Sequence, residues 1–156
     1  MKKLLSLLLI LSVMMGLNGC FGAVLKSPPE MIVTCGDVCI SVVSDDYTWT
    51  GPGKGWKKET VITCAFNSLD IFIVDPKTWN IHEVSYETVS LSFPVKPDEI
   101  TIQRIQLPAS GDYEKVTYSE NLTFQLEEGE WFYLITAFWD RNRWSGEASY
   151  RCTVSK

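Results

Sequence analysis

Cysteines are the residues of this chain with the clearest capacity for covalent chemistry. There are five, and Cys20 stands apart because it ends an apolar N-terminal stretch. The remaining four make an even set, which in an exported chain favours disulfides over free thiols. A four-thiolate metal site fits less well, because the C-x3-C pair has no matching second pair, so no metal is predicted. The disulfide candidates are Cys35, Cys39, Cys64 and Cys152.

Of the three possible pairings of these cysteines, spacing favours one and a second competes with it. Cys35 and Cys39 flank a predicted Gly36-Asp37 turn, so the first pairing joins them and leaves Cys64 with Cys152. The second bridge would close a loop of about ninety residues, for which chain entropy gives roughly 4–5 kcal/mol. The competing arrangement pairs Cys35 with Cys64 and Cys39 with Cys152.

Aromatic and basic side chains gather at two places that suit ligand binding. In the first, rings among glycines and lysines could stack on a sugar or a peptide; these rings are Tyr47, Trp49 and Trp56. The second is a predicted hairpin tip, and binding residues concentrate on such loops; it carries Arg141, Arg143 and Trp144. The alternative is that Trp49 belongs to the core and Trp144 covers one end of the domain, with the cations in solvent.

The chain has few residues that could form a catalytic site or a calcium-binding site. His82 is the single histidine, and a hydrolase would have to join it to an acid such as Glu83 and a nucleophile such as Ser85. Calcium prefers clustered oxygens, but the chain has no EF-hand pattern; the aspartates on offer are Asp45, Asp46, Asp70 and Asp75. The formal net charge of −5 argues against non-specific nucleic-acid binding. We expect no enzyme, no cofactor and no nucleic-acid partner.

The first twenty residues are typical of an export signal. Lys2 and Lys3 precede an apolar run, Leu4 to Met15, that is too short to span roughly 30 Å of hydrocarbon comfortably. The run leads to Leu17-Asn18-Gly19-Cys20, which resembles the bacterial lipobox, whose cysteine receives diacylglycerol. The resemblance implies cleavage before Cys20 and anchoring by two acyl chains. We expect a lipid-anchored protein on the extracytoplasmic face of the cell membrane, with membrane lipid as a partner.

The sequence therefore divides into three segments. Residues 1–19 are the predicted lipoprotein signal peptide, and residues 20–30 are the lipidated cysteine and a tether extended by Pro28-Pro29. In residues 31–156, strand-like runs alternate with turn residues, and no 3.6-residue apolar period persists. This pattern predicts an all-β domain, a sandwich of about seven to nine strands. The stretch 131–139 is apolar on both faces, which is typical of a central strand.

Two motifs near the ends of this domain carry a family resemblance. Tyr47-Thr48-Trp49-Thr50 precedes a Gly-rich segment ending at Trp56, and Gly146-Glu147-Ala148-Ser149-Tyr150 precedes Cys152. They resemble motifs of small uncharacterised Gram-positive surface lipoproteins with an immunoglobulin-like domain. The resemblance implies an immunoglobulin-like sandwich and surface anchoring, and no activity. Thr48 stands where that group often has a cysteine, so its usual disulfide is not carried over.

The expected function is that of a membrane-anchored, non-enzymatic domain for binding or envelope interaction. An envelope protein or a glycan is the candidate ligand. One alternative is a structural accessory subunit of a larger cell-surface complex, and a less favoured one is a small hydrolase. Tyr150 and Cys152 share a strand face, so we predict that both lie in the core and that the Tyr150 hydroxyl bonds to the backbone.

Overall fold

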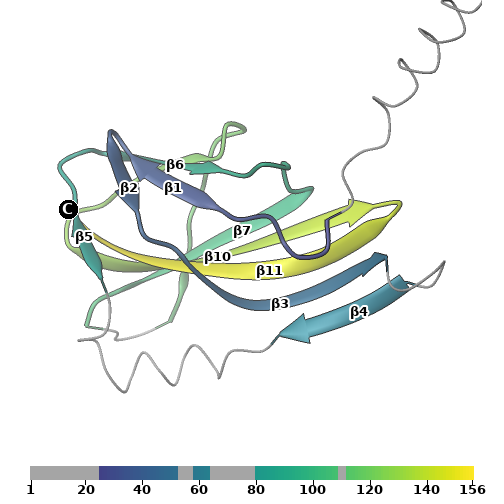
Figure 1. The fold of residues 1–156 in the computed structure, drawn as a ribbon. Helices are drawn as coiled ribbons and strands as arrows, with labels where there is room; N and C mark the ends of the chain where they lie inside the picture. Colours follow the sequence, from purple (N-terminus) through teal and green to yellow (C-terminus); the bar gives the residue numbers. More distant parts are fainter. Residues whose placement is uncertain (1–24, 53–57, 64–79, 109–111) are drawn as a thin grey trace, which may run out of the picture.

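The computed structural model describes residues 25–52, 58–63, 80–108 and 112–156, and these residues fold entirely as β-structure (Figure 1). The predicted signal peptide and Cys20 lie outside the described residues. The strands are β1 (Ile32–Cys35), β2 (Val38–Ile40), β3 (Val43–Pro52), β4 (Lys58–Thr63), β5 (Ile81–Glu83), β6 (Thr88–Ser92), β7 (Glu99–Gln106), β8 (Glu114–Lys115), β9 (Thr123–Gln125), β10 (Glu130–Arg141) and β11 (Trp144–Ser155).

These strands form two sheets, which confirms the predicted β-sandwich. One sheet has the order β2-β1-β6-β9, and the other has the order β4-β3-β11-β10-β7-β8. All pairs are antiparallel except β5, which runs parallel to the last residues of β11. The eleven described strands exceed the predicted seven to nine. The excess is explained by strands such as β5 and β8, which have only three and two residues, too few for an alternating pattern to show.

Part of the strand order can be compared with that of an immunoglobulin sandwich. In such a sandwich, strands B and E share one sheet while G, F and C lie in that order in the other. Here β6 and β9 pair in the smaller sheet, and β11, β10 and β7 are successive neighbours in the larger one. β1 pairs with β6 in the place of strand A. The insertion between β1 and β6 supplies β2 to β5, and its strand β3 lies beside β11.

Alternating residues of the central strand β10 supply much of the core. Its buried inner face consists of Trp131, Tyr133, Ile135, Ala137 and Trp139. β10 lies between β7 and β11, which confirms the prediction of a central strand. On its other face, Phe132 is fully buried and forms a small second cluster with Ile105. Both faces of β10 are therefore apolar because both are covered.

A glycine in β11 lets two tryptophans from neighbouring strands meet. Gly146 is paired with Trp49 of β3 on one side and with Trp139 of β10 on the other. The two rings pack edge to face over it, with centroids 5.7 Å apart. A Cβ on Gly146 would lie 2.2 Å from the Thr48 carbonyl oxygen and 2.6 Å from a Trp49 ring atom. The two sequence motifs thus lie side by side, and Gly146 of the second leaves room for Thr48 and Trp49 of the first.

The segment before β1 is packed onto the sandwich. The Tyr150 hydroxyl donates a hydrogen bond to the carbonyl oxygen of Pro29, which is itself buried. The Trp49 indole Nε1 donates to the Leu25 carbonyl oxygen at 3.2 Å. Tyr150 and Cys152 are both buried, so the prediction for this pair is confirmed. Residues 25–30, expected to be part of a tether, belong to the folded unit.

Candidate binding end of the sandwich

Three connections meet at one end of the sandwich, which we call the hairpin end. They are residues 93–98 between β6 and β7, residues 116–122 between β8 and β9, and the turn between β10 and β11. The Asp98 amide donates to the Phe138 carbonyl oxygen, and the Leu91 amide donates to the Leu122 carbonyl oxygen, both at 2.9 Å. These bonds tie the two longer connections to the strands beside them. Loops held on a rigid scaffold are where binding residues concentrate.

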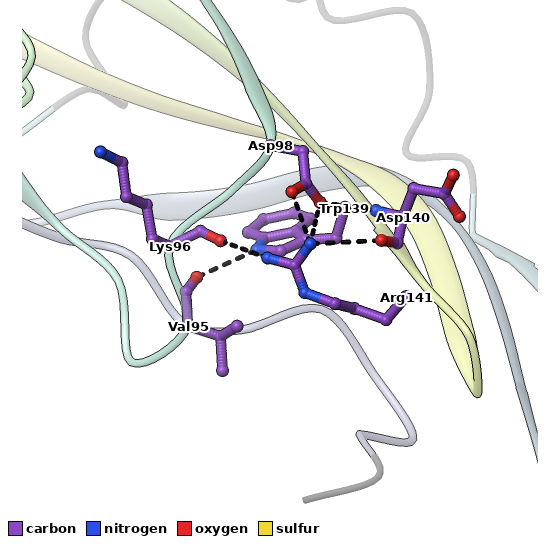
Figure 2. Close-up of polar contacts among 6 residues, drawn as sticks. All are labelled: Val95, Lys96, Asp98, Trp139, Asp140 and Arg141. Carbon is purple, nitrogen blue, oxygen red and sulfur yellow. Dashed lines mark hydrogen bonds and ion pairs between the residues drawn. The ribbon is translucent and has the colours of Figure 1, made fainter. Parts of the chain in front are cut away.

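An ion pair holds the 93–98 connection against the hairpin, as Figure 2 shows. Arg141 Nη1 contacts both carboxylate oxygens of Asp98, and Arg141 Nη2 donates to the Lys96 carbonyl oxygen at 3.0 Å. The Asp140 amide donates to Asp98 Oδ2 at 2.8 Å. The Arg141 guanidinium and this amide hold the pKa of Asp98 below its usual value. Arg141 therefore fixes the loop through its Nη1 and Nη2 donors.

A tryptophan supports the same loop from inside the sandwich. Trp139 Nε1 donates to the Val95 carbonyl oxygen at 3.0 Å (Figure 2). Its ring packs edge to face on Phe93, with centroids 5.7 Å apart. Across the end, the Tyr118 hydroxyl donates to the Ile100 carbonyl oxygen at 2.8 Å. The loop is thus bonded to buried aromatic side chains as well as to Arg141, which makes it a preorganised surface.

Two shallow hollows lie beside this loop. One has a volume of about 210 Å³ and is lined by Lys96, Pro97, Asp98, Glu99, Ile100, Tyr118, Glu120 and Leu122. The other has a volume of about 280 Å³ and is lined by Leu91, Ser92, Phe93, Lys96, Glu120, Asn121 and Leu122. They share Lys96, Glu120 and Leu122, so one cation and one carboxylate stand between them. The arrangement can offer charged groups of both signs beside apolar surface.

The backbone at the shared wall is strained. Leu122 has a φ of 57°, in the left-handed region that costs a residue with a side chain about 1–3 kcal/mol. Its amide donates to the Ser119 carbonyl oxygen at 2.9 Å. The Ser119 hydroxyl lies 2.7 Å from that of Thr123 and closes the turn. The turn 119–122 is therefore held in one geometry beside both hollows. The sequence indicated only the hairpin tip of this site, because the residues that line the two hollows come from separate connections.

The predicted aromatic ligand groups are mostly core residues. Trp49 is 1% exposed and Trp144 is 5% exposed, and their rings stack with centroids 5.1 Å apart. The ligand-binding hypothesis is wrong for these two, because both rings fill the space between the sheets, as the alternative interpretation expected. Tyr47 is half-buried against the core. Trp56 lies outside the described residues.

The two predicted arginines differ in their surroundings. The guanidinium carbon of Arg141 lies 5.9 Å from the Trp144 ring centroid, which adds a cation–π contact to its bond with Asp98. Arg143 is exposed at the turn. Of the predicted hairpin residues, Arg143 is thus the one that the structure places on the surface.

The opposite, C-terminal end is tied by a second arginine that the sequence analysis did not single out. Arg104 Nη2 lies 3.1 Å from a Glu114 carboxylate oxygen and 2.6 Å from one of Glu127. Its guanidinium carbon lies 4.3 Å from the Trp131 ring centroid. Although burial opposes it, hydrogen bonds to Glu127 and Glu114 raise the pKa of Arg104. This cluster closes the end of the core beside Tyr133.

The structure overturns the predicted bridge between Cys35 and Cys39. The two-residue turn pairs Cys35 with Val38, and Cys39 is one residue further along β2. Neighbouring residues of a strand face opposite sides, so Cys35 lies in the core and Cys39 is exposed. Both thiols are free, as is that of buried Cys152. Cys64, the predicted partner of Cys152, lies outside the described residues.

The other chemical candidates are not brought together. His82 Nε2 accepts a hydrogen bond from the Ser41 amide at 3.1 Å, which joins β5 to the segment after β2. Glu83 and Ser85 are exposed. Asp70 and Asp75 lie outside the described residues, and the described part of the chain holds no group of three or more His, Cys, Asp or Glu side chains suited to a metal ion.

Comparison with known proteins does not assign a family or a fold to this chain. No protein-family model, curated protein or solved structure matches the chain. Among the described residues, no helix has the length and apolar character needed to cross a membrane. The hairpin end consists of a loop that is bonded to Trp139, Arg141 and the Asp140 amide, and of two adjoining hollows beside it.

Proposed function

We propose that this protein is a lipid-anchored, extracytoplasmic, non-enzymatic binding domain that interacts with the cell envelope through its hairpin end. The single observation that carries the binding role is the fixed 93–98 loop. Arg141, Trp139 and the Asp140 amide hold it in place beside the two hollows. A surface that is ordered in advance loses little conformational entropy when it binds, which favours recognition.

The anchoring part of the proposal is supported by the sequence before the fold. The short apolar run ends at Gly19-Cys20, and the described domain begins only five residues after Cys20. A diacylglyceryl group supplies two acyl chains, which is what stable anchoring requires. The resemblance of the two sequence motifs to those of Gram-positive surface lipoproteins is itself part of the proposal.

The test of anchoring is metabolic labelling with a palmitate analogue. The natural chain should incorporate the label and Cys20→Ser should incorporate none. Cys39→Ser is the matched control, because it removes an exposed thiol and leaves Cys20 in place. Equal labelling of Cys20→Ser and the natural chain would refute lipidation at Cys20.

The test of binding uses a photo-crosslinker at Asn142, in the hairpin turn, in membranes of cells that express the protein. We expect an adduct with an envelope protein or glycan that is absent when the same group is placed at the exposed Ser85. An adduct pattern identical at the two positions would show that the hairpin end has no binding role.

The second candidate function is a structural subunit of a larger surface complex. Edge strand β4 exposes Ile62 by 65% and Val61 by 44%, and large exposed apolar side chains are characteristic of contact surfaces. Ile62→Lys is the variant that separates the two proposals. It should release a co-purifying protein if β4 is the contact, and it should leave the Asn142 adduct unchanged if the hairpin end binds.

A further inference from the structure

The chain reaches the folded domain at the hairpin end. Leu25, the first described residue, accepts a hydrogen bond from the indole of Trp49. Trp49 pairs with Gly146, two residues after the start of β11 at the hairpin. From there the segment runs toward the middle of β11, where the Pro29 carbonyl oxygen meets the Tyr150 hydroxyl. Figure 1 shows the described chain beginning beside the β10–β11 hairpin, while the C-terminus lies at the other end.

The length of chain between the predicted anchor and the fold is short compared with the domain. Four residues lie between Cys20 and Leu25, and the five Cα–Cα steps span at most about 18 Å when fully extended. β11 alone has 12 residues, and strand geometry makes it about 40 Å long. While Leu25 is bonded to Trp49, the distance from Cys20 to the hairpin end is limited by the length of the extended segment between Cys20 and Leu25. The C-terminal end can come as close to the membrane as the hairpin end only if the domain lies flat on the membrane or the tether detaches from the domain.

We infer that the protein stands with its hairpin end against the lipid headgroups and its C-terminal end away from the membrane. This orientation rests on the proposed lipid anchor at Cys20. The surface that the headgroup layer meets is formed by the 93–98 loop, the 119–122 turn and the β10–β11 turn. The hairpin end therefore meets its ligands at the membrane surface, and phospholipid headgroups are the first of them.

The distribution of charge is compatible with this orientation. At the C-terminal end, Glu87 and Glu128 are paired with Lys156, and Glu127 is paired with Arg104, so both signs of charge are present there. The hairpin end carries both signs, with Lys96 and Glu120 between the two hollows. Electrostatics alone does not draw the hairpin end to an anionic surface, so the docked tether sets the orientation.

The test places a fluorophore at each end of the lipidated protein in phosphatidylcholine–phosphatidylglycerol vesicles with a headgroup spin label. All proteins carry Cys64→Ser. The exposed native Cys39, close to the β1–β2 turn, takes the label at the C-terminal end. Asn142→Cys with Cys39→Ser takes it at the hairpin end. We expect the label at position 142 to lose most of its fluorescence and the label at position 39 to keep its own.

A longer tether is the matched control. About twenty Gly/Ser residues inserted after Gly22 add a root-mean-square reach of roughly 25 Å, so quenching at position 142 should fall. Equal quenching at both positions, stronger quenching at position 39, or quenching at position 142 that survives the insertion would each overturn the orientation. Palmitate labelling of the same preparations separates the causes. Without lipid the anchor itself fails and the orientation falls with it, whereas lipidated protein with equal quenching refutes the orientation alone.

Discussion

At the tip of the β10–β11 hairpin, two arginines two positions apart have different surroundings. Arg141 is bonded to Asp98, to the Lys96 carbonyl oxygen and to the backbone of Asp140, while Arg143 is exposed. A guanidinium has five donors in a rigid fork, so a carboxylate and neighbouring carbonyl oxygens can occupy it fully. The contacts of Arg141 therefore give it a structural role at the hairpin.

Asp98→Asn should destabilise the protein at neutral pH. The pKa of Asp98 is lowered in the folded state, so its contribution is present above its ordinary pKa of 3.8 and is lost as the pH falls through the folded value. The ion pair is more than one third exposed, so we expect a loss of about 1 kcal/mol at pH 7. Urea denaturation at pH 7 and at a series of lower pH values measures this, and the difference between the two proteins should shrink as the pH falls below 3.8. Asp140→Asn is the control, since Asp140 joins the cluster only through its backbone; an equal loss there would contradict the role of the carboxylate.

Thiol reactivity should separate Cys39 from the two buried cysteines. Burial raises the pKa of the Cys35 thiol and raises that of Cys152 to about 12. The thiolate is the reactive form, so iodoacetamide should modify Cys39 in the native protein without reductant and should reach the other two only after unfolding. Mass spectrometry of the peptides measures this. Native-state modification of Cys152 as fast as that of Cys39 would contradict the described core.

At the element scale, β11 and the segment before β1 depend on each other. β11 is flanked by β10 on one side and by β3 and β5 on the other. Its residue Tyr150 bonds to the Pro29 carbonyl oxygen, so the last strand also holds the first described segment. This explains why an extended, proline-containing tether is ordered: its carbonyl groups find donors on a buried strand.

Tyr150→Phe should destabilise the protein and loosen residues 25–30. The change leaves the Pro29 carbonyl oxygen without its donor, which for a buried group costs about 1–3 kcal/mol. Denaturant midpoints give the first effect, and hydrogen exchange of residues 25–30 gives the second. Tyr113→Phe is the control, because the Tyr113 ring packs on Phe132 in the outer cluster, away from the tether. If exchange in residues 25–30 is the same in both variants, the hydroxyl does not hold the tether.

Gly146→Ala should be among the most damaging single-atom additions in the domain. The new Cβ would lie 2.2 Å from the Thr48 carbonyl oxygen, and backbone cannot move aside without breaking the β3–β11 pairing. Overpacking of this kind costs about 3 kcal/mol. Thermal denaturation measures the loss, and Ser145→Ala provides a neighbouring control. A Gly146→Ala protein as stable as the natural chain would refute the close approach.

At the scale of the whole molecule, the two ends of the sandwich are closed by different devices. The hairpin end is fixed by the Asp98–Arg141 pair and by Trp139, and the C-terminal end by Arg104 between Glu114 and Glu127. The tether leaves at the hairpin end, so the domain has a defined direction relative to its predicted anchor. We therefore regard residues 25–30 as part of the fold and residues 20–24 as the linker.

Truncation tests this boundary. A protein that begins at Leu25 should be as stable as the natural chain without its signal peptide. A protein that begins at Met31 loses the acceptors of Trp49 and Tyr150, which leaves two buried donors unpaired and costs about 2–4 kcal/mol. Calorimetry of the two proteins measures the difference. Equal transition temperatures would show that residues 25–30 are a spacer only.

The all-β class and the inward-facing residues of β11 could be predicted from the sequence. Alternation over β11 is long enough to place Tyr150 and Cys152 in the core, because the side-chain period of a strand is two. Local pattern is sufficient for these properties because each depends only on neighbours along the strand.

The sequence did not predict which distant residues meet, because such contacts depend on how the strands pair. Asp98 and Arg141 are 43 positions apart, and their contact depends on the register between β7 and β10, which neither segment encodes alone. The turn at Leu122, the Arg104 cluster and the docking of Leu25 on Trp49 arise in the same way. Local sequence patterns are compatible with many ways of pairing the strands. The loops that form the hairpin end are therefore brought together only by the long-range pairing within both sheets.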